Sequence, residues 1–289
     1  MIELTDTEAK MARVLHKNSI VIDIHSDIML DVIRRRQAGS KAVISKIHIP
    51  RMRQGGVDAY FGTVGGDFPG GVERIEDVLR NIDWMHLETE ESHSQLIIAK
   101  TTDEIRQAKK QGQIAAFLIT EGLRCINWDT SLLRTLFRLG IRSCAFTWNW
   151  RNYLADRRLE RSGGGLSTFG VEVLREMNRL GMIPDIAHIS HHGKDDILKL
   201  SDGPVIASHL GAKGVYDMPA NLSDQQIEML ASKGGVIGVI FFSPALSKGH
   251  ATINDVVKHI EYITDLVGID YVSLGPDFYD YMVDDTLST

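Results

Sequence analysis

The sequence predicts a (β/α)8 barrel of the TIM type, because short apolar runs of strand length alternate along the chain with amphipathic segments of helix length. The chain has 289 residues, which is close to the usual size of one such barrel. No Pro/Ser-rich linker or low-complexity tract divides it, so we expect a single α/β domain over residues 1–289. An open, doubly wound sheet is the alternative arrangement of the same units.

Eight apolar runs have the length of buried strands. They are residues 20–24, 57–63, 113–120, 141–147, 182–187, 204–208, 235–240 and 271–275. Alternation with helices implies that the strands are parallel, and eight units favour the closed barrel over the open sheet. The segment 96–101 does not fit cleanly, and we interpret it as either an extra edge strand or a loop.

The stretches between these runs include several with the pattern of a helix. They are residues 74–92, 102–111, 169–180, 223–233 and 253–267. Ser223 and Asp224 are typical of a helix start, and Gly181 and Gly268 are typical of helix stops. After the eighth run only FYDYMVDDTLST remains, which is too short for a full eighth helix. We therefore expect the eighth helix to be missing or truncated.

The overall composition is that of an ordinary globular protein. Hydrophobic residues make up 43% of the chain and charged residues 24%. The formal net charge at pH 7 is −6, which is mildly acidic. This charge provides no electrostatic reason to expect nucleic acid or an anionic membrane surface as a partner.

Sequence features that bear on location indicate a cytoplasmic protein. The segment MIELTDTEAKMARVLHKNS contains acidic residues and no apolar core, unlike a signal peptide. No stretch of about 18 or more apolar residues is present to span a membrane. Cys125 and Cys144 form neither a disulfide framework nor a CxxC metal motif, and we expect buried free thiols.

The first candidate functional residues follow the first and third predicted strands. His25 and Asp27 are two positions apart at a strand end, so their side chains point to the same face and can hold one metal ion. Glu121 directly follows a buried run, at the rim where barrels of this kind place their active sites. Taken alone, each has an ordinary structural explanation, as a capped strand end or a carboxylate that caps a helix.

Three further candidates occupy equivalent positions later in the chain. His188 and His209 each end an apolar run, and Asp277 lies just past the last one. A histidine in such a place is more often a packed core residue than a ligand. However, the carboxyl ends of all the strands meet at one mouth of a barrel, and unrelated structural residues would not all favour that end. The set as a whole therefore predicts an active site.

The types of side chain indicate the chemistry. Imidazole and carboxylate ligands suit zinc better than calcium, and no thiolate joins them. Zinc lowers the pKa of bound water to about 7, and two metal ions roughly 3.5–4 Å apart share a hydroxide and polarise a carbonyl. A free carboxylate nearby takes a proton from water and delivers it to the leaving amine. This set therefore predicts hydrolysis of an amide or peptide bond.

From about residue 20 to residue 280, the sequence resembles the zinc dipeptidases typified by membrane (renal) dipeptidase, and in particular their bacterial branch. The resemblance lies in IDIHSD, IPRMRQGGVDAYF, ITEG, LGIRSCAFTWN, GGGLSTFGVEVLREMNRLGMIPDIAHIS, ASHLGAKG, NLSD and VSLGPDF. The GLSTFG…EMNRLGM…HIS block and its spacing to the flanking motifs are highly specific. The fold that the resemblance implies is a TIM barrel of the metal-dependent hydrolase type.

The resemblance also implies a role for each candidate. His25 and Asp27 would bind one zinc ion and the two later histidines, His188 and His209, a second one. Glu121 would bridge the two ions. The catalytic residues would be Asp277, which handles the proton, and Glu121.

Three departures from the family pattern affect the substrate-binding residues. Trp148 stands where animal members have a substrate-binding histidine, as in many bacterial relatives, and Asn149 follows it. Ala220-Asn221 stands where the family has Arg-Asn, which removes a bidentate donor for the substrate carboxylate. Lys213 could replace it only as a point charge. After the last strand the family has DFDG, and this chain has DFYD. We expect substrate contacts at Trp148, Asn149, Lys213 and Asn221.

The resemblance implies a zinc-dependent dipeptidase whose substrates are small dipeptides, often with a D-residue at the C-terminal position. It also implies a homodimer, and another divalent metal could occupy the two zinc positions. Two alternatives remain. One is a related dinuclear hydrolase for another amide or a lactam, which Ala220 favours. The other is an inactive truncated barrel, which the short C-terminal region favours.

Overall fold

The structure is a computed structural model that describes residues 4–67 and 73–278. In these residues, nine parallel strands form one sheet. They are β1 (Ile22–Ser26), β2 (Ala59–Gly66), β3 (Leu96–Ala99), β4 (Ile114–Glu121), β5 (Ser143–Ala145), β6 (Ile183–Asp185), β7 (Ile206–Leu210), β8 (Val236–Val239) and β9 (Val272–Leu274). Each of the eight apolar runs overlaps one strand, and the segment 96–101 contains β3, so it forms a strand and not only a loop.

The sheet closes into a barrel through the pairing of β2 with β4. β3 pairs with the first half of β4 and β5 with its second half, where Ile114 lies opposite Leu96 and Glu121 opposite Ala145. β3 is therefore an edge strand outside a ring of eight. This confirms the predicted (β/α)8 barrel, and the alternative of an open sheet is wrong.

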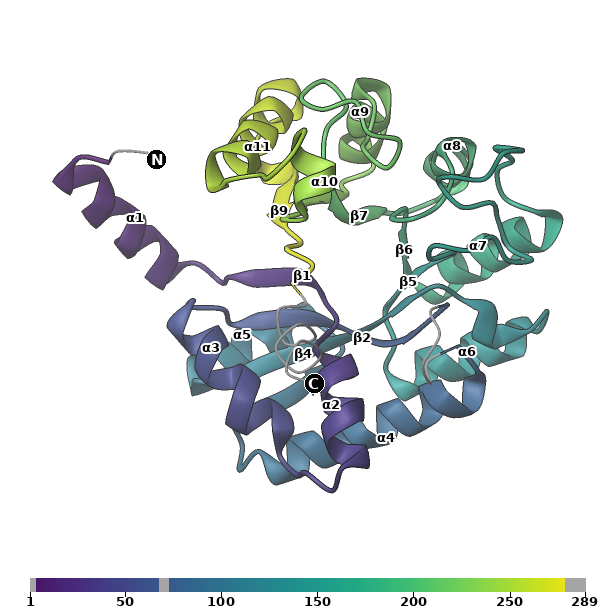
Figure 1. Cartoon of the computed structure of the whole chain (residues 1–289). Helices are drawn as coiled ribbons and strands as arrows, with labels where there is room; N and C mark the ends of the chain where they lie inside the picture. Colours follow the sequence, from purple (N-terminus) through teal and green to yellow (C-terminus); the bar gives the residue numbers. More distant parts are fainter. Residues whose placement is uncertain (1–3, 68–72, 279–289) are drawn as a thin grey trace.

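Helices surround the strands (Figure 1). They are α1 (Asp6–Asn18), α2 (Ile28–Gln37), α3 (Ile49–Gln54), α4 (Ile75–Glu91), α5 (Thr102–Gln111), α6 (Thr130–Leu139), α7 (Thr168–Leu180), α8 (His191–Leu200), α9 (Asp224–Ser232), α10 (Ser243–Leu246) and α11 (Ile253–Val267). The five predicted helices are confirmed as α4, α5, α7, α9 and α11. The expectation that the eighth helix is missing concerns residues outside the described ranges.

The predicted helix ends have the expected local chemistry. Ser223 caps α9 and forms a capping box with Gln226, so two free backbone N–H groups gain acceptors. Gly181 ends α7 with a φ of 72°, a left-handed conformation that costs glycine little. Gly268 follows α11 with a φ of 103°. The boundaries of these helices thus follow from individual residues.

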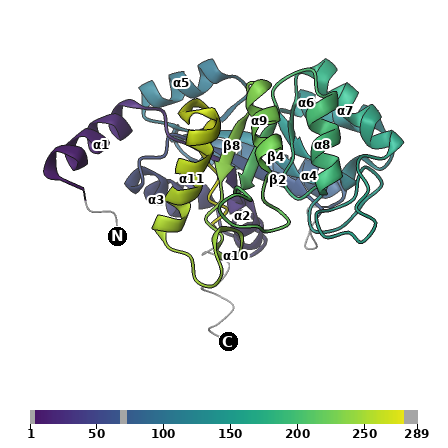
Figure 2. The same ribbon diagram turned by 90° about the horizontal axis from the view of Figure 1, so that it is seen from above.

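The first helix, α1, differs from the others in burying none of its residues. It extends away from the barrel in both views (Figures 1 and 2). His16 connects α1 to the rest of the protein, because the Nε2 atom of His16 lies 2.9 Å from the carbonyl oxygen of Gly55. Within the described ranges, no helix is both long and apolar enough to cross a membrane.

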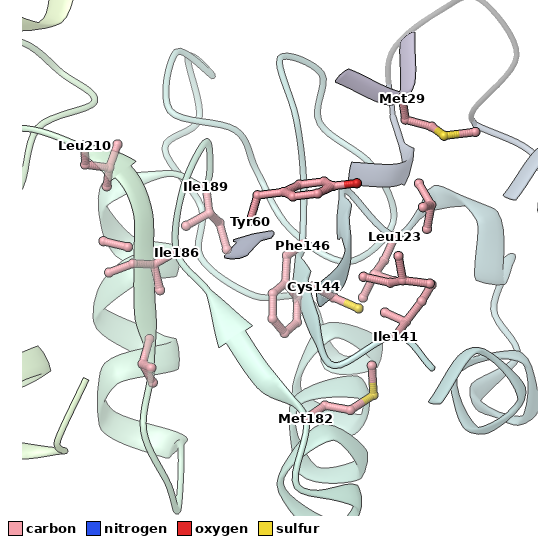
Figure 3. Packing of buried hydrophobic residues seen from close by; sticks show 14 of the residues in the cluster. Met29, Tyr60, Leu123, Ile141, Cys144, Phe146, Met182, Ile186, Ile189 and Leu210 are labelled. Atoms are coloured by element: carbon pink, nitrogen blue, oxygen red, sulfur yellow. The ribbon is translucent and has the colours of Figure 1, made fainter. Parts of the chain in front are cut away.

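The barrel wall is buried on both faces, as expected for parallel strands covered by helices. All eight residues of β4 are buried, and alternate side chains enter different apolar clusters. Ala116 and Leu118 join the larger cluster, part of which is shown in Figure 3, and Phe117 and Ile119 join the smaller one. Cys144 belongs to the larger cluster, and like Cys125 it is a buried free thiol, as predicted.

Candidate metal centre and active site

The predicted ligands converge at the carboxyl ends of the barrel strands. Four of them lie closest together, and each comes from a different strand or strand end. His25 lies in β1, Glu121 ends β4, His188 follows β6 and His209 lies in β7. Asp27 follows β1 and Asp277 follows β9. Parallel strands that close into a ring bring these positions to one mouth.

His25 is the centre of the first group of ligand atoms. Its Nε2 lies 3.5 Å from Glu121 Oε1, 3.7 Å from Asp27 Oδ1 and 3.6 Å from Asp277 Oδ1. These separations are too long for hydrogen bonds. Both ring nitrogens of His25 and the Asp27 Oδ1 are buried without a hydrogen-bond partner among the described residues.

Glu121 connects this group to a second one. Its Oε1 lies 2.8 Å from His188 Nε2 and 3.5 Å from His209 Nε2. The two imidazole Nε2 atoms are themselves 2.8 Å apart. A single carboxylate oxygen thus lies within 3.5 Å of three imidazole nitrogens, and the other oxygen, Oε2, is buried without a hydrogen-bond partner among the described residues.

These side chains fit divalent metal ions. Ligand atoms about 2.1 Å from a tetrahedral zinc ion lie roughly 3.4 Å from one another, close to the 3.5–3.7 Å separations around His25. The atoms around His25 form two overlapping groups, either of which could hold an ion: His25 with Glu121 and His209, and His25 with Asp27 and Asp277. Buried polar atoms normally have partners, so the buried ligand atoms without a hydrogen bond fit a site that binds a cation.

The charges of these side chains lead to the same conclusion. Burial raises the pKa of Glu121 well above its usual range, and the charge of Asp27 adds to the effect. Burial also raises the pKa of Asp277 to about 7. Burial lowers the pKa of His25, but the charges of Glu121 and Asp27 outweigh it and leave the pKa well above its usual value. Carboxylates packed together in this way need positive charge nearby, and a metal ion would supply it.

The two histidines that follow β6 and lie in β7 are oriented by neighbours. His188 Nδ1 lies 3.3 Å from Asn149 Oδ1, and His209 Nδ1 lies 2.8 Å from Ser208 Oγ. If each Nδ1 carries the proton and donates it, each Nε2 is left with a free lone pair. Both Nε2 atoms face Glu121, where a metal ion would need them.

Asp185 and the local backbone hold these histidines in place, which the sequence did not indicate. Asp185 Oδ1 accepts hydrogen bonds from the backbone N–H groups of Ala187, 3.0 Å away, and Ser208, 3.1 Å away. It thereby ties the residues before His188 to the strand that carries His209. His188 and Asp277 have φ values of 62° and 56°, in the left-handed region that non-glycine residues adopt rarely and that is often found at functional sites.

A cavity of about 450 Å³ opens beside these ligands, a size typical of small-molecule sites. The predicted ligands except His25 line it, and so do Trp148 and Asn149, two of the predicted substrate-binding residues. Its remaining wall is mainly apolar, from Leu30, Leu210, Ala220, Ile240, Phe242 and Ala245, with Arg158 as an exception. The cavity therefore combines a polar metal-binding end with an apolar wall.

The other two predicted substrate-binding residues do not line this cavity. Asn221 is buried and holds its loop together, because its Oδ1 accepts from the N–H of Gly211 and its Nδ2 donates to the carbonyls of Tyr216 and Ala245. Both amide hydrogens of Asn221 are therefore already used within the protein. Lys213 is partly buried nearby. Substrate contact by either residue stays a prediction.

A barrel whose mouth gathers imidazole and carboxylate groups beside a cavity defines a TIM-barrel protein of the metal-dependent hydrolase type. The comparison with known families makes the assignment specific. The profile of the membrane dipeptidase family, peptidase family M19, matches residues 9–285. The chain belongs to this family.

Individual relatives agree with this assignment. Dipeptidase verJ of Clonostachys rogersoniana is 32% identical over 209 residues, which cover 71% of this chain and 54% of that protein. An uncharacterised dipeptidase of Schizosaccharomyces pombe is 31% identical over 288 residues, covering 91% of this chain and 69% of that protein. The chain thus spans about half the length of the first relative, 54%, and 69% of the second.

Solved structures show the same fold. An amidohydrolase from Pseudomonas aeruginosa has 28% identity and a TM-score of 0.79, with coverage of 93% of this chain and 77% of that one. A metallopeptidase from Rhodobacter sphaeroides, solved with a phosphinate mimic of the dipeptide L-Ala-D-Ala, has 24% identity and a TM-score of 0.81. The alignment with the latter covers 90% of this chain and 86% of that one, and it supports the fold alone.

Proposed function

We propose that this protein is a zinc-dependent dipeptidase that holds two zinc ions and hydrolyses the peptide bond of small dipeptides. The observation that carries the proposal is the position of Glu121 Oε1, within 3.5 Å of the Nε2 atoms of His25, His188 and His209. The curated relatives named dipeptidases support the choice of reaction.

The side chains present can be assigned to two ions. His25 and Asp27 would hold one, His188 and His209 the other, and Glu121 would serve both. When bound, zinc supplies a water molecule of lowered pKa and polarises the carbonyl to be attacked. The protein's own contribution is to fix the ligands on rigid strand ends and to exclude bulk water by burial.

Asp277 is the proton-handling group in this proposal. Its side chain is 19% exposed and reaches the cavity, and its Oδ1 lies 3.6 Å from His25 Nε2. From this position Oδ1 takes the proton of the attacking water and passes it to the nitrogen of the leaving amino acid. Trp148 and Asn149 form the wall beside His188, where they hold the substrate against this carboxylate.

The experiment that tests the proposal measures hydrolysis of a panel of L,L and L,D dipeptides by the zinc-loaded protein. A chelator-treated sample and an Asp277→Asn variant accompany the wild type. We expect zinc-dependent cleavage, and a fall of roughly 100-fold or more in kcat for the variant, because it cannot accept the proton. Circular dichroism and zinc content establish that the variant is folded and loaded.

Failure of the folded, two-zinc protein to cleave any dipeptide would contradict the proposal. The same panel extended with N-acylated amides and lactams would then detect a hydrolase for another amide. Cleavage by the Asp277→Asn variant at the rate of the wild type would still support a dipeptidase, but it would contradict the proposed role of Asp277.

A further inference from the structure

Arg158 brings a positive charge into the candidate active-site cavity. It belongs to the connection between β5 and α7, far in sequence from the metal ligands. It is the one lysine or arginine among the described residues that line the cavity. The neighbouring wall residue Ala220 carries no charge, and its side chain cannot bind an anion.

Among the described residues, the guanidinium of Arg158 forms no ion pair, and the acidic groups whose charges act on it, Asp277 and Glu121, belong to the candidate metal site. Its Nη2 lies 3.4 Å from Asn149 Oδ1 and its Nη1 lies 4.0 Å from Met218 Sδ, both long contacts. Its Nε is buried with no hydrogen-bond partner in the described part of the chain. The ion pairs of the described residues do not include Arg158, although many other arginines have one.

A partly buried guanidinium whose Nε–H group has no acceptor can bind an anion. Arginine binds carboxylates through two parallel hydrogen bonds, and such charge-assisted bonds are stronger than neutral ones. A partly buried cation that forms no ion pair is costly, so an incoming carboxylate that bonds to it directly would relieve that cost.

The position of Arg158 relative to the metal ligands limits the kind of carboxylate. Asn149 Oδ1 contacts both His188 Nδ1, at 3.3 Å, and Arg158 Nη2, at 3.4 Å. One amide side chain therefore separates the guanidinium from a ligand imidazole. In a dipeptide, a single residue of about 3.8 Å separates the peptide bond from the C-terminal carboxylate. A short substrate can thus reach both groups.

We infer that Arg158 binds the C-terminal carboxylate of the substrate and so restricts this site to dipeptides with a free C-terminus. The inference rests on the proposed dipeptidase function. It gives Arg158 the role of a specificity-determining residue, and it explains how the cavity recognises a carboxylate with an alanine at position 220. Substrates whose carboxylate is esterified or amidated would lose this contact.

The test measures binding without turnover. The probes are a phosphinate mimic of L-Ala-D-Ala and its C-terminal methyl ester, titrated into zinc-loaded protein by calorimetry. We expect the wild type to prefer the acid, and Arg158→Met to lose roughly 10- to 100-fold in affinity for the acid only. Arg157→Met is the matched control, because Arg157 does not line the cavity, and it should leave both affinities unchanged.

A second variant, Arg158→Lys, keeps the charge without the paired donors and should lose less affinity than Arg158→Met. This variant keeps the test decisive if Arg158→Met fails to fold. Equal affinities of the wild type for acid and ester would overturn the inference, and so would an unchanged preference in folded Arg158→Met or in Arg158→Lys. If one of these results is found and the wild type still cleaves dipeptides, only the proposed role of Arg158 is contradicted. If the wild type neither binds the mimics nor cleaves dipeptides, the proposed dipeptidase function is contradicted as well.

Discussion

Glu121 shows how much a single side chain can contribute to this site. Its Oε1 is shared among three imidazole nitrogens, and its Oε2 has no partner in the described residues. The sequence predicted this carboxylate from its place after a buried strand. It did not predict Asp185 or Arg158, because one resembles an ordinary strand-end residue and the other stands in a charged loop run, RRLER, with no periodic pattern.

Asn149 provides a test of ligand orientation at the residue scale. We predict that Asn149→Ala lowers zinc affinity about 10- to 100-fold, because His188 loses the acceptor that orients its ring. Competition with a zinc chelator measures this affinity. Asn178→Ala is the control, since Asn178 lies near the end of α7 and donates to the carbonyl of Leu200 at the end of α8. Equal losses in both variants would show that orientation by Asn149 does not matter.

Lys194 links a buried charge to the pH dependence of stability. Its side chain is fully buried and donates to the carbonyl of Ala220, and burial lowers its pKa from 10.5 to about 7. Between pH 7 and about 10 the unfolded chain therefore binds more protons at Lys194 than the folded one, so this group's contribution to stability rises with pH and is lost as pH falls through 7.

The corresponding measurement is urea unfolding of the wild type and Lys194→Met across pH 6 to 10. The stability of the wild type relative to the variant should increase with pH above 7, with a slope of at most about 1.4 kcal/mol per unit. A difference that stays constant over this range would mean that Lys194 is charged in the folded protein.

At the scale of the elements, local signals placed the eight barrel strands and five of the eleven α-helices in the described residues. Gly181 and the Ser223 capping box mark helix ends through chemistry that acts within a few residues. Strand ends were shifted by one to three residues, because the end of pairing depends on neighbouring strands. For the same reason, the sequence did not show whether the residues of β3 form a strand or a loop. These four residues form a strand only because they pair with β4.

The cap of α9 gives a prediction at this scale. Ser223→Ala should lower the free energy of unfolding by about 1 kcal/mol, because the N–H of Gln226 loses its acceptor. Ser232→Ala, at the other end of α9, removes a bond to the Met229 carbonyl and should change stability by less than about 0.5 kcal/mol. Urea unfolding measures both variants. A loss for Ser232→Ala as large as that for Ser223→Ala would contradict the prediction.

At the scale of the whole molecule, closing the barrel makes the site. The pairing of β2 with β4 is long-range, and it brings β1 and β4 to the same mouth as β6, β7 and β9. Sequence order alone could not supply the distances around Glu121. It could predict which strand ends would meet, because a count of eight strand–helix units favours closure.

Metal binding across several strands should stabilise the whole barrel. We predict that saturating zinc raises Tm on the order of 10 °C above that of the chelated protein, because zinc binds the folded chain in preference to the unfolded one. Differential scanning calorimetry at several zinc concentrations measures the effect. A Tm that does not depend on zinc would argue against ligands shared among strands.

The most direct test of the central claim counts zinc ions bound per chain. Elemental analysis after removal of excess zinc should find about two per chain in the wild type and in Glu228→Gln, a control on the exposed face of α9. Glu121→Gln should retain clearly fewer, because the residue proposed to serve both ions is lost. A folded wild type without zinc, or a Glu121→Gln variant that keeps the wild-type content, would contradict the proposed metal centre.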